Sequence, residues 1–134
     1  MSVRYLLDTN IVSDLVRHPR GKIAAKIAAV GENSVATSII VAAELRYGAA
    51  KKGSQRLSER VDLVLDAFEV IPFESPADKT YGDVRAALQK AGTLIGPNDL
   101  LIAAQALTLS LALVTDNTRE FARVDGVKLE NWLR

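Results

Sequence analysis

Apolar residues form two kinds of segment that alternate from one end of the chain to the other. Five short segments, most of them mainly apolar, have the length of buried strands and cover residues 3–7, 34–37, 68–72, 111–115 and 127–132. Between them, apolar residues recur every three to four positions, as on one face of a helix. We predict helices over residues 11–16, 23–30, 39–50, 55–67, 76–91 and 99–109, with a turn or short helix at 117–122.

Punctuating residues mark where several of these helices begin and end. Ser38 is placed to cap the helix that starts at residue 39, and Pro76 suits a first helical position, where its missing N–H is not needed. Strands without polar alternation indicate a parallel sheet covered on both faces. The chain therefore predicts one α/β domain over residues 1–134, a three-layer α/β/α sandwich with a short, mainly parallel sheet of four or five strands.

Composition excludes several classes of protein and site. The chain has 134 residues, no cysteine and a single histidine, His18, which rules out disulfide frameworks, cysteine-based metal sites, thiol nucleophiles and multi-histidine centres within one chain. No segment has the length and apolarity of a membrane span, and residues 1–5 do not begin a signal peptide, so we expect a cytoplasmic protein. A mean hydropathy of +0.11 predicts either an alanine-rich core or the buried face of a homodimer.

The formal net charge of +1 hides an uneven distribution. Residues 1–60 carry ten Lys or Arg against five Asp or Glu, whereas residues 61–134 carry seven against eleven. Many of the N-terminal cations fall at positions 17–26 and 46–60. They form either ordinary solvated helix faces or a positive rim that attracts a polyanion.

Acidic residues stand where the predicted strands end or the following helices begin. Asp8 and Asp116 follow the strands at 3–7 and 111–115, Asp99 lies in a first helical turn, and Glu44 lies in the helix that starts at 39. Asp8 could instead be a helix cap, and Asp99 could complement the helix dipole. Glu44 has partly apolar neighbours at helical spacing, so its carboxylate needs a hydrogen-bonding or ionic partner if it is buried. Gly48, one helical turn later, would let another backbone approach on that side.

Four carboxylates at one edge of a sheet require protons, basic partners or a bound cation, because they repel one another. Since neither cysteine nor a second histidine is available, the ligands would be oxygens, which select Mg²⁺ or Mn²⁺. Such a cation can activate water for displacement at phosphorus.

Four motifs, in order, resemble those of the PIN-domain ribonucleases, and especially the VapC-type toxins of bacterial toxin–antitoxin pairs. They are Leu-Leu-Asp-Thr-Asn-Ile at 6–11, Ala-Glu-Leu at 43–45 with Gly48, Gly-Pro-Asn-Asp-Leu-Leu-Ile-Ala-Ala at 96–104, and Leu-Val-Thr-Asp-Asn at 113–117 with Arg-Glu-Phe at 119–121. The ending at 127–132 is also typical of these toxins.

The resemblance implies a PIN-like fold and an endoribonuclease that depends on Mg²⁺ or Mn²⁺. It places Asp8, Glu44, Asp99 and Asp116 at the catalytic, metal-binding positions, with Thr9, Asn10 and Thr115 as polar residues near them. It implies an RNA contact at Arg85 (a surface salt bridge is the alternative), a structured RNA substrate such as transfer RNA, and a homodimer. It also implies inhibition by a cognate VapB-like antitoxin, a small DNA-binding protein with a basic C-terminal segment.

Two other functional classes fit part of the pattern. An aspartyl-phosphate phosphotransferase would place a nucleophile at Asp8, but it usually has a second acid two residues later, where this chain has Asn10. A non-catalytic binding module would use the acidic pocket to receive a basic partner peptide. Phosphate trapped covalently on Asp8 would identify the phosphotransferase. Partner binding that survives removal of metal would identify the binding module.

Overall fold

The computed structural model describes residues 2–134, whose strands form one parallel sheet in the order β3-β2-β1-β4-β5. The strands are β1 (Tyr5–Leu7), β2 (Val35–Ser38), β3 (Glu69–Ile71), β4 (Ala112–Val114) and β5 (Lys128–Glu130). The helices are α1 (Thr9–Arg17), α2 (Lys22–Val30), α3 (Ile39–Lys52), α4 (Gln55–Asp66), α5 (Ala77–Ala91), α6 (Pro97–Leu109) and α7 (Thr118–Phe121), with a 3₁₀ turn at Glu32–Ser34.

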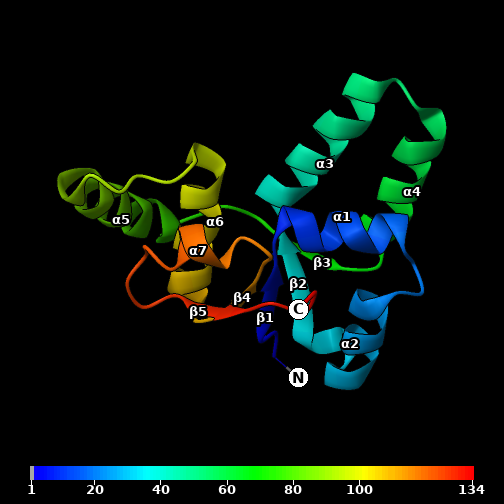
Figure 1. The fold of residues 1–134 in the computed structure, drawn as a ribbon, viewed down its shortest axis with the longest axis horizontal. Coiled ribbons are helices and arrows are strands. Elements are labelled where there is room, and N and C mark those ends of the chain that lie inside the picture. The colour runs from blue at the N-terminus through cyan, green and yellow to red at the C-terminus, as the bar shows by residue number, and fades with distance from the viewer. Residues whose placement is uncertain (1) are drawn as a thin grey trace.

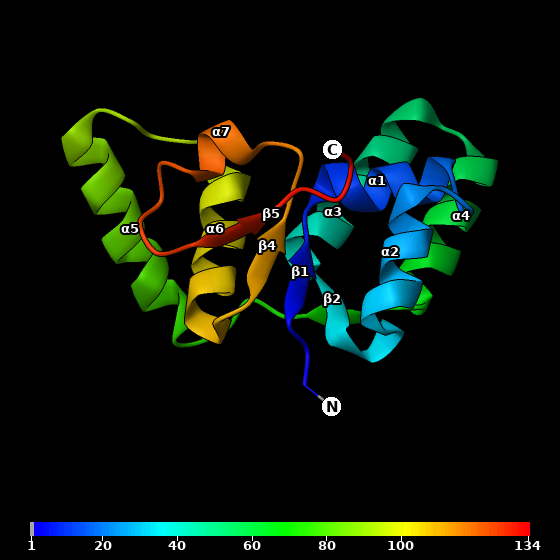
Figure 2. The same cartoon turned by 60° about the horizontal axis from the view of Figure 1, so that its bottom comes forward.

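The connections determine which helices cover which face of the sheet. The chain adds β2 and β3 on one side of β1, then returns to add β4 and β5 on the other. Because crossovers between parallel strands are right-handed, α1 to α4 cover one face and α5 to α7 the other. The two groups lie on opposite sides of the strands (Figure 1, Figure 2). The predicted α/β sandwich with a parallel sheet is confirmed.

Buried aliphatic side chains fill the space between the sheet and both helical layers. Leu6 and Leu7 of β1, and Leu113 and Val114 of β4, have no exposed surface, as expected for central strands covered on both faces. Phe121 of α7 is also fully buried. Within residues 2–134, no helix combines the length and apolarity needed to cross a bilayer.

The helix starts agree with the sequence predictions at Ser38 but not at Pro76. The Ser38 hydroxyl accepts a hydrogen bond from the Ile40 N–H at 3.0 Å and caps α3. The helix α5 begins at Ala77, so Pro76 is the residue before it, and Pro97 is the proline that occupies the first turn of a helix, in α6. The backbone of Pro76 has ψ near 19°, outside the helical region, so the helix starts only at the next residue. Before Pro97, Gly96 has an extended ψ of 149°, and α6 begins at the proline itself.

A buried amide connects the two helices that carry Glu44 and Asp99. The Gln105 side chain, 1% exposed on α6, is hydrogen-bonded to the Ser38 hydroxyl at the start of α3. Its Nε2 donates to the carbonyls of Ile71 and Pro72 at 3.1 Å each. One side chain therefore joins α6, the start of α3 and the end of β3.

We expect Gln105→Leu to lower the free energy of unfolding by about 2–3 kcal/mol, because it removes the buried hydrogen bond with the Ser38 hydroxyl and two partly buried hydrogen bonds to the carbonyls of Ile71 and Pro72. Urea unfolding with an unchanged m-value measures this loss. Thr108→Val is the matched control, since it removes a partly buried hydrogen bond to Thr80 from the same helix. Equal losses in the two variants would contradict a special role for Gln105.

Candidate functional site

The strands β1 and β4 are neighbours at the place where the strand order reverses, with β2 and β3 on one side and β5 on the other. Open parallel sheets bind ligands at the carboxyl ends of the strands at such a place. Asp8 directly follows β1 and is 3% exposed. Although it occupies the cap position of α1, its carboxylate makes no capping hydrogen bond. Instead, Oδ2 accepts from the fully buried Thr115 hydroxyl at 2.7 Å. The interpretation of Asp8 as a side-chain cap is therefore wrong.

Glu44 reaches the same edge of the sheet from the second turn of α3. Its Oε1 accepts a hydrogen bond from the Thr9 hydroxyl, and its Oε2 accepts from Asn98 Nδ2 at 3.2 Å. Thr9 begins α1 and Asn98 lies beside Asp99 at the start of α6. Both Glu44 oxygens are thus oriented by residues adjacent to the other two acids.

Asp99 lies in the first turn of α6 and shares its surroundings with Glu120 of α7. A Cβ built on Gly96 would lie 3.6 Å from Asp99 Oδ2 and 3.7 Å from Glu120 Oε1, so the two carboxyl groups meet beside this glycine. Glu120 Oε1 accepts from the Gly96 N–H at 2.9 Å, and Oε2 accepts from Asn117 Nδ2 at 2.9 Å. Asp99 and Glu120 are also hydrogen-bonded to each other.

The protonation of these groups reflects their crowding. Burial, followed by the negative charges of Asp8 and Glu120, raises the pKa of Asp99 to about 7. Burial is also the main cause that raises the pKa of Asp8, and the charge of Glu44 adds to it. Hydrogen bonds from Gly96 and Asn117 lower the pKa of Glu120, so the proton of the Asp99–Glu120 pair resides on Asp99. We call Asp8, Glu44, Asp99 and Glu120 the acidic cluster.

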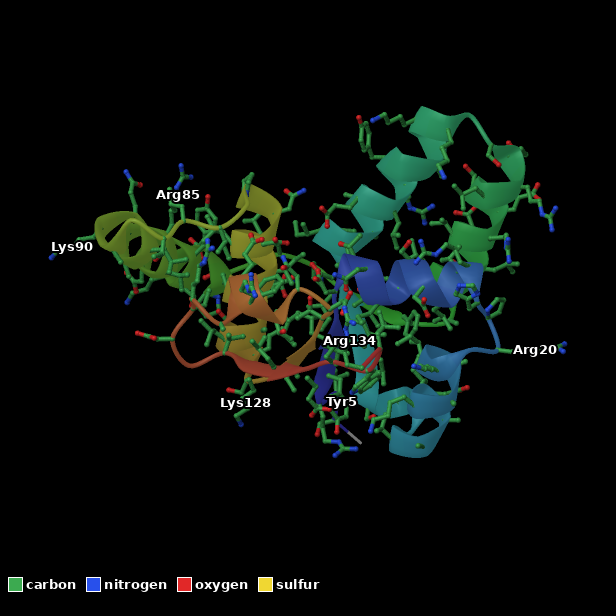
Figure 3. The ribbon with its side chains drawn as sticks, in the orientation of Figure 1. Tyr5, Arg20, Arg85, Lys90, Lys128 and Arg134 are labelled. Carbon is green, nitrogen blue, oxygen red and sulfur yellow. The ribbon has the colours of Figure 1, made fainter. Side chains whose placement is uncertain are left out.

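Asp116 lies at the same end of the sheet but turns toward the C-terminal residues. Its Oδ1 accepts from Asn131 Nδ2 at 3.0 Å and from Arg134 Nε at 3.1 Å, and these two partners lower its pKa. Its backbone N–H donates to Asn10 Oδ1 at 3.1 Å. In Figure 3, Arg134 lies where the C-terminal segment crosses the sheet near α1. The assignment of Asp116 as a metal ligand stays a prediction.

The donor set of the acidic cluster fits a hard divalent cation in its chemistry. All four groups are carboxylates, and within residues 2–134 no Lys, Arg or His forms an ion pair with any of them. Burial is the main cause that raises the pKa of Asp8 and Asp99, and the charges of neighbouring acids in the cluster add to it. As the side chains lie, no group of three or more His, Cys, Asp or Glu residues within 2–134 is already arranged to hold a metal ion. The carboxylate oxygens instead accept hydrogen bonds from Thr115, Thr9, Asn98, Gly96 and Asn117.

The structure brings most of the sequence-predicted site residues together and adds one. Thr9, Asn10 and Thr115 each hydrogen-bond to one of the predicted acids. Arg85 lies apart on α5, where it donates to the Tyr81 hydroxyl at 2.8 Å and points away from the sheet (Figure 3), so its RNA contact remains untested.

Two further residues near the site bear on the sequence predictions. Glu120 lies in the segment 117–122 that the sequence predicts as a turn or short helix, and it is not among the predicted site residues, although its place four residues after Asp116 puts it at the same sheet edge. No neighbouring backbone within residues 2–134 approaches Gly48, because a Cβ there would meet no atom within 4 Å, so the fold itself does not use the space that the glycine leaves.

Comparison with known proteins identifies close relatives along almost the whole chain. The PIN domain family matches residues 5–127. Ribonuclease VapC2 of Rickettsia felis is 39% identical over 130 residues, covering 96% of this chain and 97% of the relative. The tRNA(fMet)-specific endonuclease VapC of Shigella flexneri is 31% identical, covering 97% and 98%. Among solved structures, VapBC2 of Rickettsia felis bound to a promoter DNA fragment superposes with a TM-score of 0.90 at 36% identity, covering 98% and 99%.

Proposed function

This chain belongs to the PIN-domain family, among the VapC ribonucleases of toxin–antitoxin systems, and we propose that it is a Mg²⁺- or Mn²⁺-dependent endoribonuclease whose active site is the acidic cluster. The observation that carries the metal dependence is the convergence of Asp8, Glu44, Asp99 and Glu120 with no basic side chain hydrogen-bonded to them within residues 2–134. A bound cation would supply an activated water and neutralise charge that develops on the phosphate.

The chain's own residues have distinct tasks in this proposal. Asp8 and Asp99 bind the cation, with Glu44 and Glu120 as the acids beside them. Thr115 orients Asp8, whereas Thr9 and Asn98 fix the two oxygens of Glu44. Such orienting hydrogen bonds commonly change metal affinity or activity 10- to 100-fold, so these neutral residues are part of the site.

The proposed substrate is a structured RNA, and transfer RNA is the one we favour. The support is the Shigella flexneri relative, whose name states specificity for tRNA(fMet) and which aligns over 97% of this chain. The test is to incubate the purified protein with Mn²⁺ and an unfractionated transfer-RNA pool and to sequence the new RNA ends. A single dominant end in one transfer RNA supports the proposal, and cleavage confined to other RNAs refutes this substrate.

The partner we propose is a VapB-like antitoxin, a small DNA-binding protein whose basic C-terminal segment enters the acidic site. The support is the high similarity to a solved VapBC complex bound to promoter DNA. We further propose a homodimer that acts in the cytoplasm, where transfer RNA is available. Copurification with the product of the neighbouring reading frame tests the partner, and light scattering of the free protein tests the dimer.

Removal and return of metal provides a direct test. We expect chelation to abolish RNA cleavage and added Mn²⁺ to restore it. At pH 8, where Asp99 is largely ionised, saturating Mn²⁺ should also raise the melting temperature by several degrees, because the cation binds the folded cluster and not the unfolded chain. Differential scanning fluorimetry measures the shift. Cleavage that persists after exhaustive chelation would contradict the proposal, whatever the melting temperature does.

A further inference from the structure

A groove of about 290 Å³ adjoins the acidic cluster and lies between α1, α3 and α4. Thr9 and Glu44 line one end of it, and Arg17 and Lys52 line the other. On both α1 and α3, eight residues separate these ends, which corresponds to about 12 Å along each helix. The helices α3 and α4 form a hairpin that extends beyond α1 (Figure 1). A strand held at the cluster could therefore continue along this groove.

The far end of the groove carries two exposed cations, of which Arg17 has only a long ion pair and Lys52 has none within residues 2–134. The Arg17 side chain is 63% exposed and reaches only Asp14, at 3.9 Å. Lys52 is exposed, and no carboxylate within residues 2–134 forms an ion pair with it. In contrast, Arg46 on the same helix is paired with Asp62. Two available cations favour a phosphate backbone over a basic peptide at this end.

Gly48 lies midway along the groove, at a position where the fold does not require glycine. It is inside α3, with φ outside the left-handed range, and a Cβ there would meet no atom within 4 Å. Glycine is among the least favourable residues in a helix interior, so alanine would suit the isolated chain better. The absent side chain leaves space along the groove wall for a ligand that approaches α3 closely.

We propose that this groove binds the single-stranded RNA segment next to the scissile phosphate, with Arg17 and Lys52 contacting its phosphates and Gly48 admitting the strand. The proposal rests on the ribonuclease function proposed above and deepens it. It defines a substrate-binding path that begins at Glu44 and Thr9 and continues along α1 and α3.

The chain offers matched control variants for each part of the groove. Lys51→Ala removes the same charge as Lys52→Ala from the neighbouring position, and Lys51 does not line the groove. Arg20 serves similarly for Arg17, since its side chain points away from the molecule (Figure 3). Gly82→Ala fills an equally open interior position of α5, away from the groove. Within each pair, the groove variant and its control make the same change in charge or in helix propensity.

The experiment measures cleavage of an unfractionated transfer-RNA pool with Mn²⁺ at several salt concentrations. Lys52→Ala and Arg17→Ala should each raise KM about three- to tenfold with little change in kcat, and each should reduce the logarithmic salt slope of kcat/KM by about 0.7. Lys51→Ala and Arg20→Ala should change KM less than about twofold.

The glycine pair separates binding from folding. Gly48→Ala and Gly82→Ala should both raise the melting temperature by a few degrees, but only Gly48→Ala should raise KM. If the unmodified protein cleaves RNA and all variants share its KM and salt slope, the groove proposal fails while the ribonuclease function stands. If Gly48→Ala has the KM of the unmodified protein but is inhibited less by the cognate antitoxin, the groove binds a peptide of the antitoxin and not RNA. Absence of cleavage by the unmodified protein would instead refute the proposed function.

Discussion

Asp99→Asn should abolish RNA cleavage while making the metal-free protein more stable at pH 8. The loss of activity follows because the variant lacks a carboxylate that the proposed cation needs, and we expect a factor on the order of 1,000 in kcat/KM. Quantitative gel assays of the transfer-RNA pool with Mn²⁺ measure it. Cleavage within about tenfold of the unmodified protein would contradict the assignment of Asp99.

The gain in stability follows from the pKa of the same group. The folded-state pKa of Asp99 is about 7, above the ordinary value of 3.8, so the folded protein binds more protons than the unfolded chain between these limits. Stability of the metal-free protein therefore decreases as pH rises through this range. Because asparagine does not ionise, Asp99→Asn should remove this dependence and add about 1–2 kcal/mol at pH 8, a value reduced for the half-buried position.

Chemical denaturation at pH 5 and pH 8 without metal tests this second effect. The two proteins should differ little at pH 5 and clearly at pH 8. With saturating Mn²⁺ the order at pH 8 should reverse, since only the unmodified protein binds the cation tightly. A variant that is less stable than the unmodified protein under all these conditions would show a structural defect, and its inactivity would then say nothing about metal.

Glu120→Gln should reduce cleavage by about 100-fold, whereas Asp116→Asn should reduce it less than about tenfold. The reason is geometric. Glu120 meets Asp99 beside Gly96, and both of its oxygens are fixed by hydrogen bonds. The Asp116 carboxylate is instead occupied by Asn131 and Arg134.

Manganese titration by calorimetry, together with the cleavage assay, separates the two acids. Glu120→Gln should weaken metal binding, and Asp116→Asn should leave it nearly unchanged. Asn131→Ala is a useful further variant, because it removes the hydrogen bond from Asn131 to Asp116 and keeps the Asp116 carboxylate. If Asp116→Asn proves the more damaging substitution, Asp116 must turn toward the cation on binding, as the sequence motif first suggested.

Local sequence was sufficient for the alternation of strands and helices and for the grouping of three of the acids, Asp8, Glu44 and Asp99. The last two residues of β1 and of β4 are buried, as the short apolar runs there predict for strands of a sheet covered on both faces. Ser38 capped its helix as its residue type predicts, because capping depends on neighbours within three residues. Asp8, Glu44 and Asp99 could be grouped because the carboxyl ends of parallel strands share one edge.

Only the tertiary structure decided the places of Glu120 and Asp116. Glu120 joins Asp99 because α7 packs its Phe121 into the core and so directs the preceding side chain toward Gly96, 24 residues earlier. The Asp116 carboxylate is instead held by hydrogen bonds from Asn131 and Arg134, which lie beyond β5. Helix periodicity and strand patterning describe neighbours in sequence, whereas these contacts depend on how distant segments are placed by the core. The sequence thus determined the fold class and the sheet edge where the acids gather, and the packing of α7 and the C-terminal residues determined which acids make up the proposed site.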